Sequence, residues 1–231
     1  MADERATIST LYAFAFLATG SRGDANALVF VALRTSKRAG TGSALEVLTG
    51  IAARAIARAS KPRRSFAELD DLLRQEPGPE FSQPVDEVVA WEVKRTCLAA
   101  VLGCLTATVR VTFLLTDVLG WEPGKAAALL EIEEGAYRVR LARARRAVEG
   151  FLGPRCQHVA RGNPCSCRAA APAWVESGAV DLPPEEDRPS GAHDAERCRD
   201  DVGHLYRLLP RARVGAGELE SAVDSLRGDD E

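Results

Sequence analysis

Two neighbouring stretches of the sequence hold the side chains best suited to bind a partner or an ion. Residues 135–152, GAYRVRLARARRAVEGFL, hold five arginines and one acid. Residues 156–167, CQHVARGNPCSC, hold three cysteines and one histidine. Guanidinium groups suit phosphates and guanine edges, whereas thiolates and imidazoles suit zinc. The whole chain has a formal net charge of only −3, so the positive charge of the first stretch needs a reason.

The arginine-rich stretch predicts a helix with one apolar face. Tyr137, Leu141, Ala144 and Val148 recur at i, i+4, i+7 and i+11, which places them on a single stripe. Residues 136–168 hold eight arginines and one acid, a local charge of +7, and like charges this close repel one another unless a polyanion meets them. A solvated helix face is the alternative, but we favour nucleic-acid binding. The arginines that lie off the apolar stripe are Arg138, Arg140, Arg143, Arg145 and Arg146.

The cysteine-rich stretch predicts at most one zinc ion, and no other cofactor is expected. Cys156, His158, Cys165 and Cys167 are the candidate ligands. Their spacing, C-x-H followed by C-x-C, is tighter than that of the usual zinc knuckle. There are therefore two alternatives: the thiols have no ligand role, or two of them form a redox pair. For the cysteines at 97 and 104, seven residues apart on an expected helix, core packing is the favoured interpretation.

The elements that must position these residues are expected to be helices. Of the 231 residues, 46% are hydrophobic and only 6% aromatic, and the apolar runs show no strand-like alternation. We therefore predict an all-α fold with four parts. These are a helical domain at 7–64, an acidic linker at 65–87, a second helical domain at 88–152, and a cysteine-containing segment with an acidic, partly helical tail at 153–231.

The periodicity places helices in both domains. Three are expected in the first, at 8–18, 24–38 and 44–61, and one short helix is expected in the linker, at 66–74. In the second domain, helices at 89–105 and 106–120 precede a short helix that starts at Glu122 and Pro123 and ends near Leu130. A tight turn then leads into the arginine-rich helix. Two helices joined in this way predict a helix-turn-helix.

Several function classes receive no support from the sequence. It contains no Gly-rich phosphate loop, no nucleophile motif and no paired carboxylates typical of an enzyme. The first residues lack the basic start of a secretory signal, and the longest uncharged run near the middle ends at Arg110, too short to span a bilayer. We expect a non-enzymatic, cytoplasmic protein without membrane insertion.

The second domain resembles region 4 of bacterial sigma factors of the extracytoplasmic-function type, which belong to the sigma-70 superfamily. The resemblance rests on Leu105, on Arg110 ahead of the apolar run FLLTDVLG, and on the segments KAAALLEIEEGAY and RVRLARARRAV. Thr106 stands where that family usually has proline. The resemblance implies a winged-helix-like helix-turn-helix that reads the minus-thirty-five element of promoters.

The first domain is similar to region 2 of the same family. The segments TGSRGDANALVFVALR and ALEVLTGIAARAIARASKPRR carry this similarity. The family's acidic pair and glutamine are replaced here by Asn26, Ala27 and Phe30, which implies weaker or different binding to the polymerase core. The polymerase-binding residues that the resemblance implies are Asp24, Asn26, Leu28, Val29 and Leu33.

The resemblance as a whole implies a sigma factor that directs RNA polymerase to promoters. Promoter DNA and the polymerase core would be its partners, and an anti-sigma factor is left open as a third. Arg138 and Arg140 are the implied specificity residues. The alternative is a degenerate sigma-like regulatory or metal-sensing protein with little or no core binding. The implied DNA-binding residues are Gly135, Ala136, Arg138, Arg140, Arg143, Arg145 and Arg146 in the second domain, and Arg54 and Arg58 in the first.

Overall fold

All regular secondary structure in the described residues is helical. The structure is a computed structural model that describes residues 2–36, 44–58, 62–74, 85, 87–180 and 205–206. Within these ranges there are helices and no strand, which confirms the predicted all-α class. No helix in the same ranges is long and apolar enough to cross a membrane. Much of the predicted linker, and most of the predicted acidic tail beyond residue 180, lie outside the described residues.

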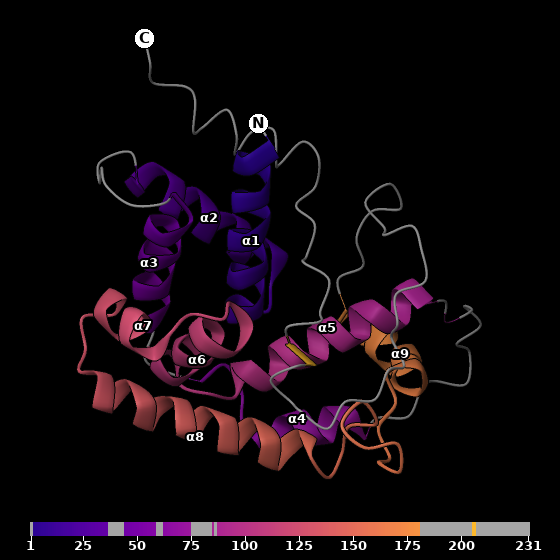
Figure 1. Cartoon of the computed structure of the whole chain (residues 1–231). Helices are drawn as coiled ribbons and strands as arrows, with labels where there is room; N and C mark the ends of the chain where they lie inside the picture. Colours follow the sequence, from indigo (N-terminus) through magenta and orange to yellow (C-terminus); the bar gives the residue numbers. More distant parts are fainter. Residues whose placement is uncertain are drawn as a thin grey trace.

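The first domain contains the three predicted helices. They are α1 (Ala2–Thr19), α2 (Arg22–Ser36) and α3 (Ala44–Ala57), which occupy the upper part of Figure 1. Helix α1 ends just before Gly20, whose φ of 68° is a left-handed conformation that favours glycine. The Gly20 amide donates to the Phe16 carbonyl at 2.6 Å and closes the last turn. This tight end brings α2 back against α1.

The rest of the described chain forms further helices, and the longest of them lies at the bottom of Figure 1. They are α4 (Phe66–Leu73), α5 (Glu87–Gly103), α6 (Ala107–Phe113) with its π-helical continuation η1 (Leu114–Val118), α7 (Pro123–Leu129), α8 (Glu134–Leu152) and α9 (Cys167–Glu176). The short helix predicted in the linker is present as α4. It begins with a capping box in which Ser65 and Glu68 satisfy each other's backbone amides.

Helix α9 was not predicted from the sequence. Pro172 lies inside it, and a proline in a helix interior normally argues against a helix. The signal in favour is Ser166, whose hydroxyl accepts a hydrogen bond from the Ala169 amide at 3.2 Å as an N-cap. Helix α9 packs against α5 (Figure 1).

A single apolar core runs through both predicted domains. Phe14 and Leu33 from the first domain and Val111 and Phe113 from the second belong to the same buried cluster. Helix α1 packs on α5, and α3 packs on α6. The two regions predicted as separate domains therefore lie directly against each other in this structure (Figure 1).

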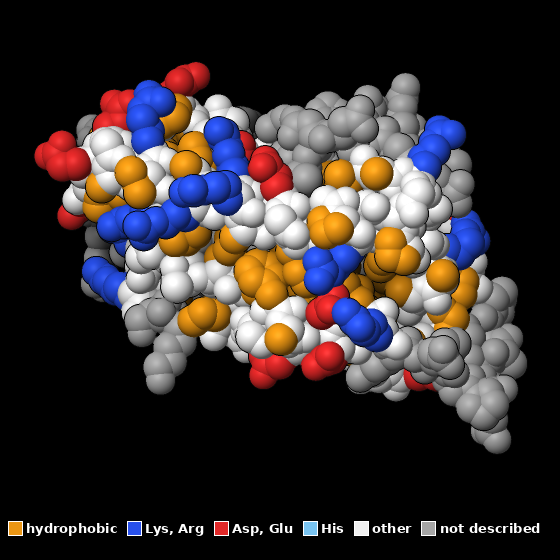
Figure 2. Space-filling view, turned by 90° about the horizontal axis from the view of Figure 1, so that it is seen from below, with side chains coloured by type: hydrophobic (Ala, Val, Ile, Leu, Met, Phe, Trp, Pro, Cys, Tyr) orange, Lys and Arg blue, Asp and Glu red, His pale blue; other side chains and the backbone are white. Residues whose placement is uncertain are grey.

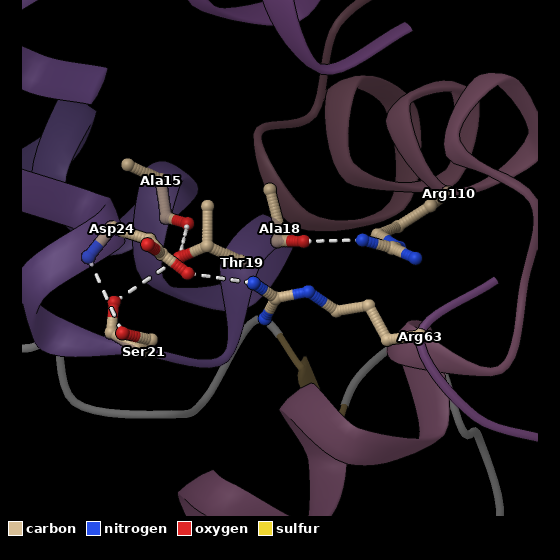
Figure 3. Close-up of polar contacts among 7 residues, drawn as sticks. All are labelled: Ala15, Ala18, Thr19, Ser21, Asp24, Arg63 and Arg110. Atoms are coloured by element: carbon tan, nitrogen blue, oxygen red, sulfur yellow. Dashed lines mark hydrogen bonds and ion pairs between the residues drawn. The ribbon is translucent and has the colours of Figure 1, made fainter. Parts of the chain in front are cut away.

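A buried arginine links the two regions. Arg110 on α6 is 4% exposed, and its guanidinium donates to the Ala18 carbonyl at 2.6 Å (Figure 3). It donates to the Leu102 carbonyl at 2.8 Å. It also donates to Gly103 at 3.2 Å and Leu105 at 3.0 Å. The carbonyls of Ala18, Leu102 and Gly103 lie at the C-terminal ends of α1 and α5, where the helix dipole is negative. Burial lowers the pKa of Arg110 to about 10, so the group is still charged at neutral pH.

Candidate nucleic-acid interface

Helices α7 and α8 form the predicted helix-turn-helix. Glu122 is the N-cap of α7 and Pro123 its first residue, as predicted. Between the helices, Glu131 adopts a left-handed φ of 56°, and the Ile132 amide donates to the Ala127 carbonyl at 3.1 Å. The turn therefore ends α7 sharply and directs the chain into α8, which packs on both α6 and α7.

The apolar stripe of α8 is buried, as the sequence predicted. Tyr137, Leu141, Ala144 and Val148 all lie in the core. The Tyr137 hydroxyl donates to the Thr112 carbonyl at 2.9 Å. Its burial raises the pKa of Tyr137 to about 12, so the phenol remains a neutral donor. One face of α8 is thus fixed to the protein, and the opposite face is turned outward.

The five arginines of α8 that were predicted to bind DNA differ in their surroundings. Arg138 is exposed and pairs with Glu134 at 2.6 Å. Arg145 makes a bidentate pair with Asp117, at 2.7 and 2.9 Å, that fastens α8 to η1. Arg143 and Arg146 are exposed, and Arg140 is half-buried. None of these last three has an acidic partner within the ranges that the structure describes.

Acids from other elements neutralise part of the charge expected from the sequence. Arg155, just beyond α8, pairs with Asp70 of α4 at 2.6 Å and lies over the Phe151 ring. The bond from Arg155 is the main reason that the pKa of Asp70 lies below its ordinary value, and Arg74 contributes further. The positive surface is therefore narrower than the local charge of +7 suggests. Figure 2 shows the side where α8 lies, with Lys and Arg side chains spread among apolar ones.

The first turn of α8 is open to solvent. Gly135 and Ala136, both predicted to contact DNA, are exposed. A Cβ atom built on Gly135 would meet no atom within 4 Å. The fold itself therefore does not require glycine at this position, and a partner could approach the backbone closely here.

A comparison with known protein families gives one match, in the central part of the chain. Residues 95–148 match the family described as Sigma-70, region 4. The matched segment begins within α5 and ends within α8, so it contains the helix-turn-helix and the arginines up to Arg146. It supports a sigma-factor-like role in DNA binding and transcription for this segment. No curated protein and no solved structure matched the chain.

The region 4 segment holds its predicted DNA-binding residues on one helix, but those predicted in the first domain are arranged differently. Arg54 donates to the carbonyl of Leu129, the last residue of α7, at 3.1 Å. Arg58, one helical turn later, is exposed. In this arrangement Arg54 contacts the region 4 segment, and only Arg58 presents its charge to solvent.

The predicted polymerase-binding residues on α2 are divided between surface and core. Asp24 is exposed and pairs with Arg63 at 2.7 Å (Figure 3), while Asn26 and Leu28 are half-buried. Val29 and Leu33 are buried in the core, which corrects their assignment as partner contacts. Helical periodicity explains the correction, because these two residues lie on the inward face of α2.

The cysteine-rich segment is folded tightly after α8. Cys156 and Cys165 face each other in an isolated parallel bridge, and the Cys165 amide donates to the Arg155 carbonyl at 3.0 Å. The Cys167 thiol lies 3.5 Å from Nε2 of His158, which is buried. No three Cys, His, Asp or Glu side chains in the described ranges are grouped so that they could hold a metal ion. The zinc site stays a prediction.

Proposed function

We propose that this protein is a sigma factor that binds the RNA polymerase core and directs it to promoters. The observation that carries the proposal is the coincidence of two independent features. The region 4 match at 95–148 covers a helix-turn-helix, and the second helix of that motif buries its apolar stripe while Arg143 and Arg146 point to solvent.

In this proposal α8 lies in the major groove of the minus-thirty-five element. A recognition helix places residues of its N-terminal half against base edges, while arginines along its length contact phosphates and fix its position. Arg140, Arg143 and Arg146 supply the phosphate contacts, because no acid within the described ranges pairs with them. Arg145 holds α8 in its orientation through Asp117. No covalent step is involved, so the protein is not an enzyme.

The first domain supplies the contact with the polymerase core. Helix α2 would present Asp24, Asn26 and Leu28 to the core enzyme, and Arg58, just after α3, would face the non-template strand near the minus-ten element. The protein would act in the cytoplasm, together with the polymerase. An anti-sigma factor that covers either surface would be a suitable regulator.

Transcription in vitro tests this function directly. The purified full chain and core polymerase are supplied with fragments of the source genome, and initiation sites are mapped by sequencing the transcripts. We expect initiation at a set of sites that share an upstream motif, and loss of it with the R143E/R146E double variant. The matched control is R74E, which reverses an exposed arginine at the end of α4, away from both proposed contact surfaces. Initiation that does not depend on the chain would overturn the proposal.

A second function is favoured by specific residues of the first domain. Asn26, Ala27 and Phe30 replace the polar residues expected for core binding, and Arg54 is bound to the region 4 segment. These features suit a sigma-like regulator that binds DNA or a protein without the polymerase. Pull-down of the core enzyme separates the two functions, because such a regulator would leave the core in the unbound fraction.

Zinc binding by the segment after α8 remains part of the proposal. The contact between Cys167 and His158 supports it, since the Cys167 thiol lies 3.5 Å from Nε2 of His158. Zinc content of the purified full chain, measured by mass spectrometry under native conditions, tests it. We expect one zinc ion in the parent chain and none in C165S/C167S. Absence of zinc from the parent chain after purification with added zinc would overturn it.

A further inference from the structure

An apolar side chain lies exposed in the middle of the arginine-bearing face of α8. Val139 is 52% exposed, and it is one of two large hydrophobic residues that are exposed in the described ranges. The other is Val31 on α2, with the same exposed fraction of 52%. A single exposed valine is ordinary on a protein surface, so the position of Val139 on its helix must carry the argument.

The geometry of α8 places Val139 opposite the buried stripe. At about 100° per residue, Val139 lies about 200° around the helix axis from Tyr137, which is fully buried. The same count places Arg138 and Arg140 about 90° to 110° away from the centre of the outward face. We use "outward face" for the exposed residues that surround this centre, which are Gly135, Val139, Ala142, Arg143, Arg146 and Gly150.

The neighbours of Val139 on this face leave its side chain prominent. Gly135 precedes it by one turn and has no side chain, and Ala142 follows with a single methyl group. Arg143 and Arg146, further along, are long enough to reach outward to phosphates. In the N-terminal half of the outward face, Val139 therefore has the side chain that extends farthest from the helix axis.

The chemistry of the major groove offers few groups that an apolar side chain can recognise. Base edges there carry hydrogen-bond donors and acceptors, and the C5-methyl group of thymine is the apolar exception. The two methyl groups of valine cannot form hydrogen bonds, but they gain by removing a thymine methyl from water. A valine at the centre of a recognition helix thus favours thymine over cytosine at the facing position.

We propose that Val139 is a specificity-determining residue that reads the C5-methyl group of a thymine in the promoter. This inference rests on the proposed function, because it needs α8 in the major groove. It assigns Arg138 and Arg140 to the flanks of the contact, where they meet phosphates instead of bases. The pairing of Arg138 with Glu134 at 2.6 Å agrees with a position beside the groove floor.

A selection experiment followed by a thymine scan tests the inference. Duplexes that the full chain binds are selected from a random-sequence pool, and each thymine of the selected motif is then replaced in turn by deoxyuridine, which lacks only the methyl group. We expect one replacement to weaken binding by about fourfold, the ratio expected for one buried methyl-sized group. V139A should bind the parent duplex about fourfold or more weakly and should be indifferent to that replacement.

The matched control is V31A, which truncates the equally exposed valine of α2. It should keep the affinity and the full thymine dependence of the parent chain. A scan with no sensitive thymine, or a sensitive thymine that V139A still detects, would overturn the role of Val139 while leaving DNA binding intact. Failure to select any duplex would instead overturn DNA reading by α8, and the role of Val139 with it.

Discussion

The guanidinium of Arg110 and the carbonyl of Ala18 join the two helical regions of this protein at 2.6 Å. The residues are far apart in sequence, one at the end of α1 and the other on α6. Three further carbonyls at the end of α5 and just beyond it complete the set of acceptors. A single side chain therefore caps helix ends of both regions, and the region 4 segment is packed against the first domain through it.

Replacing Arg110 should destabilise the whole protein. R110A removes the donor from four buried carbonyls, and we expect the free energy of unfolding to fall by about 2–4 kcal/mol, since bonds to charged donors are stronger than neutral ones. R110K should recover part of this loss, because one ammonium group cannot reach all four acceptors. Urea unfolding followed by circular dichroism measures both. A loss below about 0.5 kcal/mol in R110A would show that the link contributes little.

The arginines of α8 should divide into one that supports the fold and others that do not. R145A removes the bidentate partner of Asp117, whose side chain is 8% exposed, and should lower stability by about 1–2 kcal/mol, given that the arginine itself is half-exposed. R143A should stay within about 0.5 kcal/mol of the parent. Thermal unfolding of the two variants provides the comparison. Equal losses would contradict the division.

Two glycines of α8 separate helix stability from DNA contact. Gly135 and Gly150 are both exposed, with open space where a Cβ would lie. Alanine at either position should stabilise the helix by about 0.5–1 kcal/mol. G135A should nevertheless weaken DNA binding, because its methyl group enters the N-terminal end of the outward face, where α8 meets base edges. G150A lies about 22 Å away along the helix and should not weaken it. Fluorescence anisotropy with a selected duplex measures this, and equal affinities of both variants would count against close approach at Gly135.

The contact between Asp70 and Arg155 should make stability depend on pH in the acidic range. The pKa of Asp70 is lowered, mainly by its hydrogen bond from Arg155. A carboxyl whose pKa is depressed by folding contributes stability above its unfolded pKa, and loses that contribution as pH falls through the folded value. D70N should therefore be less stable than the parent at neutral pH, and the difference should vanish on acidification. Urea unfolding at several pH values tests this, and a constant difference would rule out the linkage.

Local periodicity predicted much of the fold and part of the site. The helices of both domains and the buried stripe of α8 follow from apolar spacing along the chain, because one face of each helix must be buried. The same projection of α8 places Val139 on the outward face, whereas the family resemblance implies Arg138 and Arg140 as the specificity residues. Val29 and Leu33 could have been assigned to the core in the same way.

Long-range contacts could not be predicted from the sequence. The partner of Arg145 is an acid on η1, and the partner of Arg155 is an acid on α4. Such pairs depend on how the helices pack, and no local pattern encodes them. The packing of the two regions likewise places the partly buried Arg54 of α3 against the Leu129 carbonyl at the end of α7. For this reason the sequence overstated the charge available to a polyanion.

The salt dependence of DNA binding tests most directly the claim that the outward face of α8 contacts DNA. The affinity of the full chain for a selected duplex is measured over a range of salt concentrations. We predict a steep linear fall of log K with log salt, and a slope reduced by about 1.8 in R143A/R146A, since each lost phosphate contact removes about 0.9. R34A should keep the parent slope. An unchanged slope in R143A/R146A would contradict the claim.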